Sequence, residues 1–174
     1  MKQLFLILTF IVFGLKIHGQ DNSPKYPAIQ KLVNSINSDK DLKKITLDTD
    51  EFLEHTPDGG GELVGYFGNK QIRRISVSVG ISIGVRTYDY YFDNEKLIFV
   101  HEILDGYLYN DSLGVFDFTK TEMNFSGSYY FWNNKLIDSI TIGHNRFEND
   151  ELDIQTVLLN EMNEYLALLK KKLK

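Results

Sequence analysis

Cysteine is absent from the 174-residue chain. Disulfides, thiolate metal ligands and a thiol nucleophile are therefore excluded. The N-terminal thioether lipid that tethers many bacterial envelope proteins also needs a cysteine. If the chain is exported, we therefore expect a soluble protein without a lipid anchor.

Positive charge is scarce, because 19 Lys and Arg residues stand against 24 Asp and Glu residues and give a net charge of −5. The only basic cluster, at 170–174, ends a predicted helix, where cations complement the helix dipole. Proteins bind nucleic acids through clustered cations that displace counterions. Nucleic acid is therefore not an expected partner.

Metal-ligating and phosphate-binding patterns are lacking as well. His55, His101 and His144 are scattered and form no His-x-x-x-His pair. The segment 48–50 begins like a calcium loop, but Phe52 stands at the next ligand position. The triple glycine at 59–61 lacks the following lysine and helix of a phosphate loop. We expect no metal and no cofactor.

The first 19 residues have the pattern of a secretory signal peptide, with Lys2 near the start, an apolar run over 4–13 and Gly19 before Gln20. The run is about half of the roughly 20 residues that span a bilayer, which argues against a membrane anchor. We predict a signal peptide over 1–19, export to the periplasm or beyond, no stable membrane insertion after cleavage, and one domain over 20–174.

Three stretches repeat one pattern, in which aromatic and branched residues flank a two-residue turn that begins with Asn: 66–72, 91–97 and 130–136. Asn is the non-glycine residue that best tolerates a left-handed backbone, so it suits the type I′ turn of a β-hairpin. The pattern predicts hairpins over 62–79, 85–104 and 124–142. The expected fold class is α+β, with an antiparallel sheet of three consecutive hairpins and six or more strands.

Helices are predicted at both ends of the sheet. Ser23-Pro24 followed by an apolar stripe predicts a helix over about 25–38. Asn149 or Asp150 is expected to cap a C-terminal helix, with Asp153 in its first turn and an apolar stripe that packs on the sheet. A strand over 45–48 and a helical turn over 50–55 precede the hairpins.

The segment 105–123 separates the second hairpin from the third. An irregular loop of this length is uncommon in a compact domain and is often functional, for example as a lid. The alternative is an additional edge strand through 115–120.

Two-residue turns also predict the register of the strands. Tyr88 is expected to pair with His101, Tyr90 with Phe99, and Thr87 with Glu102. His101 then faces Tyr88 inside the core. One face of the sheet collects the expected core beneath both helices: Leu63, Phe67, Ile72, Tyr88, Tyr90, Phe92, Leu97, Phe99, Ile103, Phe125, Tyr129, Phe131, Leu136, Ile140 and Ile142.

The opposite face repeats a tyrosine at the same position of each hairpin. Each tyrosine has an apolar body and a polar tip, so a row of them suits binding at low entropic cost. The predicted ligand- or partner-binding residues are Tyr66, Arg73, Tyr91, Glu102, Tyr130 and Trp132. The alternative is that a helix or the 105–123 segment covers this face.

No serine stands in a nucleophile elbow. The expected function is an exported, soluble, non-catalytic binding module for an unknown protein or small ligand of the cell envelope. Two alternatives stay open. One is a small acid–base hydrolase with a pocket near Asp89, His101 and Glu102, and the other is a purely structural envelope protein.

Together, residues 59–66, 90–100 and 129–137 resemble a family of small exported bacterial proteins of unknown function with repeated Tyr-Tyr-Phe-x-Asn-x-Lys-Leu-Ile hairpins. They are also distantly similar to MORN-type repeats. The resemblance implies a hairpin sheet and export, and it carries over no catalytic residue. Relatives usually show Asp-Gly in the second turn, where this chain has Asn94-Glu95.

Overall fold

The computed structural model describes residues 26–148 and 151–173. The elements follow in the order α1 (Pro27–Ser38), β1 (Lys43–Asp48), α2 (Thr49–Phe52), β2 (Gly61–Gly68), β3 (Gln71–Ile81), β4 (Gly84–Asp93), β5 (Lys96–Asn110), β6 (Val115–Trp132), β7 (Lys135–Ile142) and α3 (Ile154–Lys172). The predicted signal peptide and the predicted caps Ser23, Asn149 and Asp150 lie outside the described residues.

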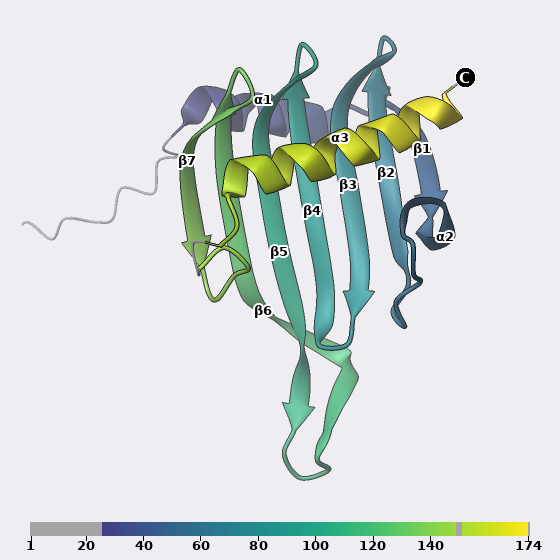
Figure 1. The fold of residues 1–174 in the computed structure, drawn as a ribbon, viewed down its shortest axis with the longest axis vertical. Coiled ribbons are helices and arrows are strands. Elements are labelled where there is room, and N and C mark those ends of the chain that lie inside the picture. Colours follow the sequence, from purple (N-terminus) through teal and green to yellow (C-terminus); the bar gives the residue numbers. More distant parts are fainter. Residues whose placement is uncertain (1–25, 149–150, 174) are drawn as a thin grey trace, which may run out of the picture.

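The strands form one antiparallel sheet in which each strand lies beside its neighbour in the sequence, from β1 to β7 (Figure 1). The predicted α+β class is confirmed at this level: an antiparallel sheet with a helix at each end of the described chain. No helix in the described ranges is long and apolar enough to cross a membrane.

The three Asn-led turns are confirmed. In each turn both residues have positive φ: Asn69 and Lys70, Asn94 and Glu95, Asn133 and Asn134, with values between 48° and 67°. A type I′ turn requires the left-handed conformation at both central positions. Glu95 thus adopts the conformation for which glycine is the better choice.

Each hairpin carries a β-bulge just after its turn. The register shifts between Tyr66 and Phe67, between Tyr91 and Phe92, and between Tyr130 and Phe131. The opposing strand holds one extra residue each time: Arg73, Ile98 and Ile137. An extra residue reverses the in–out alternation of everything beyond it.

The predicted register was therefore wrong beyond the bulges. Phe92 pairs with Leu97 as the turn requires, but Tyr88 pairs with Glu102 and not with His101. His101 pairs with Asp89, on the other face. The prediction of His101 facing Tyr88 in the core fails for the same reason.

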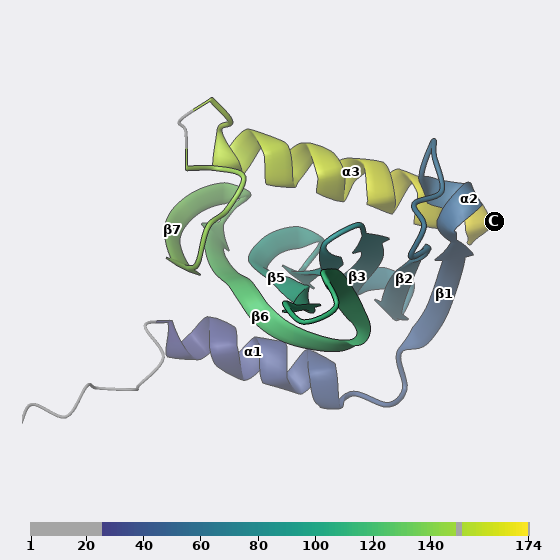
Figure 2. The same cartoon turned by 90° about the horizontal axis from the view of Figure 1, so that it is seen from below.

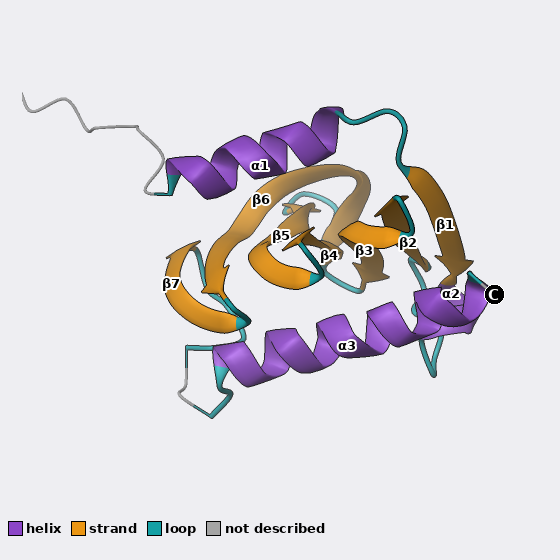
Figure 3. Ribbon diagram, turned by 90° about the horizontal axis from the view of Figure 1, so that it is seen from above, coloured by secondary structure: helices purple, strands orange, loops and turns teal. Residues whose placement is uncertain are grey.

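The two long helices cover opposite faces of the sheet, as the views along the strands show (Figures 2 and 3). Leu158, Met162 and Leu169 of α3 pack on the larger cluster, whereas Val33 and Ile36 of α1 pack on a smaller one. The expectation that both helices cover one face was wrong. Most of the expected core faces α3, but the bulge places Phe99 under α1, and Ile140 and Ile142 are exposed.

The C-terminal helix begins later than the sequence predicted. Asp153 is its N-cap, because its carboxylate accepts a hydrogen bond from the backbone N–H of Thr156 at 2.8 Å. The prediction that Asp153 lies in the first turn was wrong.

The segment 105–123 is not an irregular loop. Residues 115–120 are strand, as the alternative predicted, but they form the start of β6 and not an additional strand. β5 continues to Asn110 and β6 starts at Val115, so the two strands extend as an arm beyond their neighbours (Figure 1). Pairing between Asn110 and Val115 closes the arm.

Candidate functional site

One row of side chains crosses all seven strands on the α1 face. Its members lie opposite one another in succession: Lys44, Tyr66, Arg74, Tyr91, Phe99, Tyr130 and Asp138. The repeated tyrosines of the three hairpins thus lie in a single cross-strand row.

The bulges determine which residues join this row. Because Arg73, Ile98 and Ile137 are the extra residues, their successors Arg74, Phe99 and Asp138 stand opposite the tyrosines. Arg74 and Phe99 therefore alternate with the three tyrosines along the row.

Helix α1 covers the middle of the row. Tyr91 and Tyr130 are only 4 % and 8 % exposed, and they cluster with Val33, Ile36 and Phe99. These two predicted binding residues are therefore inside the protein, where they hold α1 on the sheet.

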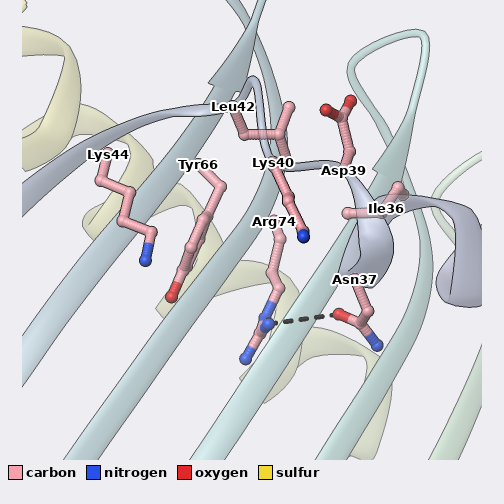
Figure 4. Close-up of a pocket in the computed structure, with 8 residues that line it drawn as sticks. All are labelled: Ile36, Asn37, Asp39, Lys40, Leu42, Lys44, Tyr66 and Arg74. Atoms are coloured by element: carbon pink, nitrogen blue, oxygen red, sulfur yellow. Dashed lines mark hydrogen bonds between the residues drawn. The ribbon is translucent and has the colours of Figure 1, made fainter.

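The row emerges from beneath α1 at Lys44, Tyr66 and Arg74. The ammonium of Lys44 lies 5.4 Å from the centre of the Tyr66 ring, and the guanidinium carbon of Arg74 lies 5.0 Å from it. These side chains line a hollow of about 350 Å³ between α1 and the sheet (Figure 4). Its lining consists of Ile36, Asn37, Asp39, Lys40, Leu42, Lys44, Tyr66 and Arg74.

Arg74 is held in place on two sides. Its Nε donates to Asp89 at 3.0 Å, and its Nη1 donates to the side chain of Asn37 on α1 at 3.2 Å. The hydroxyl of Tyr91 donates to the same Asn37 oxygen at 3.1 Å. Burial by itself lowers the pKa of Arg74, but Asp89, Tyr91 and Tyr66 together more than offset this and raise it, so Arg74 stays charged.

A second hollow of about 170 Å³ adjoins the first and shares Ile36, Asp39 and Leu42 with it. Arg73, the bulge residue of the first hairpin, lines this second hollow. We call the two hollows together the cationic groove, because Lys40, Lys44, Arg73 and Arg74 line it against the single carboxylate of Asp39.

Glu102 lies on the opposite side of the sheet, facing α3. It is 1 % exposed, and its carboxylate lies 3.9 Å from Nε of Arg86 and 4.0 Å from Nε of Arg146. The Tyr129 hydroxyl donates to it at 3.4 Å. Burial raises the pKa of Glu102, and the two arginines offset this only in part. Glu102 therefore does not share a surface with Tyr66 and Arg73.

Asp89 and His101 lie opposite each other on the α1 face. His101 Nε2 is 3.3 Å from Ser126 Oγ, and burial lowers the pKa of its imidazole despite the nearby Asp89. The sheet separates this pair from Glu102, so the three groups proposed for hydrolysis do not meet. Trp132, the last predicted site residue, is 69 % exposed in β6 next to the β6–β7 turn.

Among residues 26–148 and 151–173, no group of three or more His, Asp or Glu side chains is arranged to hold a metal ion. Comparisons of the chain with family models, with curated proteins and with solved structures found no match.

Sequence reasoning identified Tyr66 and Arg73 in the groove but missed Lys40, Lys44 and Arg74. One signal was available. Ile72 and Ile75 are both apolar although period-two alternation puts residues three apart on opposite faces. The structure places both in the cluster under α3, which requires the bulge between them. The contribution of Lys40 depends on where α1 lies, which no strand pattern shows.

Proposed function

We propose that this chain is an exported, soluble binding module and that its ligand is a small anion held in the cationic groove. The observation that carries the proposal is the concentration of Lys40, Lys44, Arg73 and Arg74 along the cationic groove in a chain with a net charge of −5. Four cations gathered in one concave place of an acidic protein create a local positive potential there.

The cations have complementary roles in this proposal. Arg74 is fixed by Asp89 and Asn37, so its guanidinium offers a preorganised contact. Lys40 and Lys44 are exposed, and neither forms an ion pair within the described parts of the chain. Their flexible ammonium groups are available to close on an anion after it enters.

The size of the groove limits the ligand. A volume of about 350 Å³ lies near the lower end for small-molecule sites. Ile36 and Leu42 add apolar walls to the charged lining. A compact carboxylate or phosphate compound with a short apolar portion fits this combination best.

Export is part of the proposal. It is supported by the signal-peptide pattern of residues 1–19 and by the resemblance of the hairpins to small exported proteins. Mass spectrometry of the chain recovered from the periplasm or medium tests it, and we expect a product that begins near Gln20.

The binding site is tested by titration with inorganic phosphate and with citrate, followed by backbone amide NMR. We expect shifts confined to residues around Lys44, Tyr66 and Arg74. The double variant Lys40→Gln/Lys44→Gln should weaken the binding by about tenfold or more, which corresponds to roughly 1.4 kcal/mol.

The matched control is Lys170→Gln/Lys171→Gln, which removes the same charge from the end of α3. This control should bind like the wild type. Equal weakening in both double variants, or shifts scattered over the surface, would show that only net charge matters and would end the proposal.

A further inference from the structure

The arm formed by the ends of β5 and β6 exposes an unusual amount of apolar surface. Six of its large apolar side chains are between 37 % and 72 % exposed: Tyr109, Leu113, Val115, Phe116, Phe118 and Met123. Exposed apolar side chains gathered on one short segment mark interaction sites more often than scattered single residues do.

The aromatic rings of the arm are held in a fixed arrangement. Tyr107 and Phe118 meet edge to face at 5.0 Å, and Tyr109 and Phe116 do so at 5.3 Å. Because each ring is braced by the ring across the arm, little side-chain entropy is lost when a partner binds.

The arm is also acidic. Within 105–123, four carboxylates stand against one cation, Lys120, and this lysine is already paired with Asp117 at 2.9 Å. Aromatic faces carry negative charge density, so rings and carboxylates together favour a cationic partner. An anionic membrane surface would be repelled.

A hollow lies where the arm meets the rest of the sheet. Its volume is about 270 Å³, and its lining is Asp58, Gly59, Ile81, Ser82, Tyr107 and Phe118. This is below the range for drug-sized ligands and suits a single inserted side chain. Asp58 is exposed, and its carboxylate forms no ion pair with another described residue.

We propose that the arm is a docking surface for a basic, apolar segment of a partner protein. One arginine or lysine of that segment occupies the hollow, with its charge on Asp58 and its stem against Tyr107 and Phe118. The neighbouring apolar side chains of the partner cover Tyr109 and Phe116.

This surface is independent of the cationic groove. The groove adjoins the β2–β3 turn, whereas the arm projects at the other end of the strands (Figure 1). Either proposal can therefore fail without the other.

The test uses two blocked hexapeptides as probes, one alternating leucine with arginine and one alternating leucine with glutamate. Calorimetry and amide NMR measure their binding to the full mature chain. We expect the arginine peptide to bind about tenfold or more tightly than the glutamate peptide, with shifts at Tyr107 and Phe118. Asp58→Asn and Phe118→Ser should each weaken it by about fivefold or more.

The matched control is Ile142→Ser, which removes an apolar side chain of similar exposure, 64 % against 67 % for Phe118, from the edge strand β7. This variant should bind like the wild type. Because Asp58 and Phe118 are exposed, amide spectra of both variants should otherwise match the wild type.

Four outcomes would overturn the proposal. They are equal affinity for both peptides, full binding by Asp58→Asn and Phe118→Ser, a wild-type dimer that Phe118→Ser dissociates, and Phe118-dependent binding to zwitterionic lipid vesicles without peptide binding. The last two would assign the arm to self-association or to a lipid surface.

Discussion

Tyr66 lies directly opposite Arg74 across β2 and β3, with the guanidinium carbon 5.0 Å from the centre of the ring. The simple hairpin register would place Arg73 on this face, but the bulge makes Arg73 the extra residue. Because the same shift recurs in all three hairpins, it determines which residues form the row on the α1 face and which lie under α3.

Arg74 and Arg73 should differ in their contribution to stability. Arg74→Met breaks the hydrogen bonds to Asp89 and Asn37, and we expect a loss of about 1–3 kcal/mol because a charged group loses its partners. Arg73→Met should change the free energy of unfolding by less than about 0.5 kcal/mol. Urea unfolding of both variants measures the difference, and equal losses would contradict the bulged register.

The stability contribution of Glu102 should depend on pH. Burial raises its pKa in the folded state above the unfolded value of about 4.3. The folded state therefore holds the proton more tightly, and the resulting stabilisation is complete below the unfolded pKa and is lost as the pH rises through the folded pKa.

Glu102→Gln removes this ionisation and leaves the shape nearly unchanged. Urea unfolding of wild type and variant from about pH 4 to 8 should show the wild type losing stability relative to the variant as the pH rises. A stability difference that stays constant with pH would mean that the arginines balance burial, and one that changes in favour of the wild type would mean that they outweigh it.

Arg146 supports the same cluster from the segment before α3. It forms an ion pair with Glu161, lies near Glu102, and its guanidinium stacks on Tyr88 and Phe147. Arg146→Met leaves two carboxylates without this cation, and we expect a loss of about 3 kcal/mol.

A double-mutant cycle with Glu161→Gln separates the ion pair from the packing. The coupling energy should be about 1 kcal/mol or more, because both side chains are largely shielded from water. Additive effects would show that Arg146 acts through packing alone.

The second turn should tolerate glycine better than its native residue. Glu95 has φ of 61°, where a side chain is strained, so Glu95→Gly should stabilise the protein by about 0.5–1 kcal/mol. Asn134 has the same φ, but its side chain accepts a hydrogen bond from the backbone N–H of Leu97 at 2.9 Å. Asn134→Gly should therefore give no gain. Thermal unfolding of both variants measures these changes in stability. A gain in stability in Asn134→Gly but not in Glu95→Gly would contradict this prediction.

The core position Phe92 should be among the most sensitive. Its side chain is fully buried in the cluster under α3, so Phe92→Ala should cost about 3–5 kcal/mol. Trp132→Ala, at a site 69 % exposed, should cost less than about 0.5 kcal/mol. Chemical denaturation of the pair measures the contrast, and similar losses would argue against the described packing.

Local patterns were sufficient to predict the hairpins. Asn at the start of each turn and the flanking aromatic residues specified where Asn69, Asn94 and Asn133 reverse the chain. Pairs next to the turns, such as Phe92 with Leu97, follow directly from that geometry.

The faces beyond the turns could not be predicted in the same way. An extra residue such as Ile98 costs little locally and is apolar like its neighbours, so strict alternation misassigned Phe99, His101 and Glu102. The groove was only partly predicted, because Asn37 of α1 and Lys40 just after this helix line it, and the face that α1 covers depends on packing across the whole sheet.

The bulged register is tested most directly by cross-strand NOEs in the isotope-labelled chain. Contacts that join the backbones of Tyr88 and Glu102, and of Asp89 and His101, are the predicted result. Contacts that instead join Tyr88 to His101 and Thr87 to Glu102 would contradict it, and Glu102 would then lie on the α1 face.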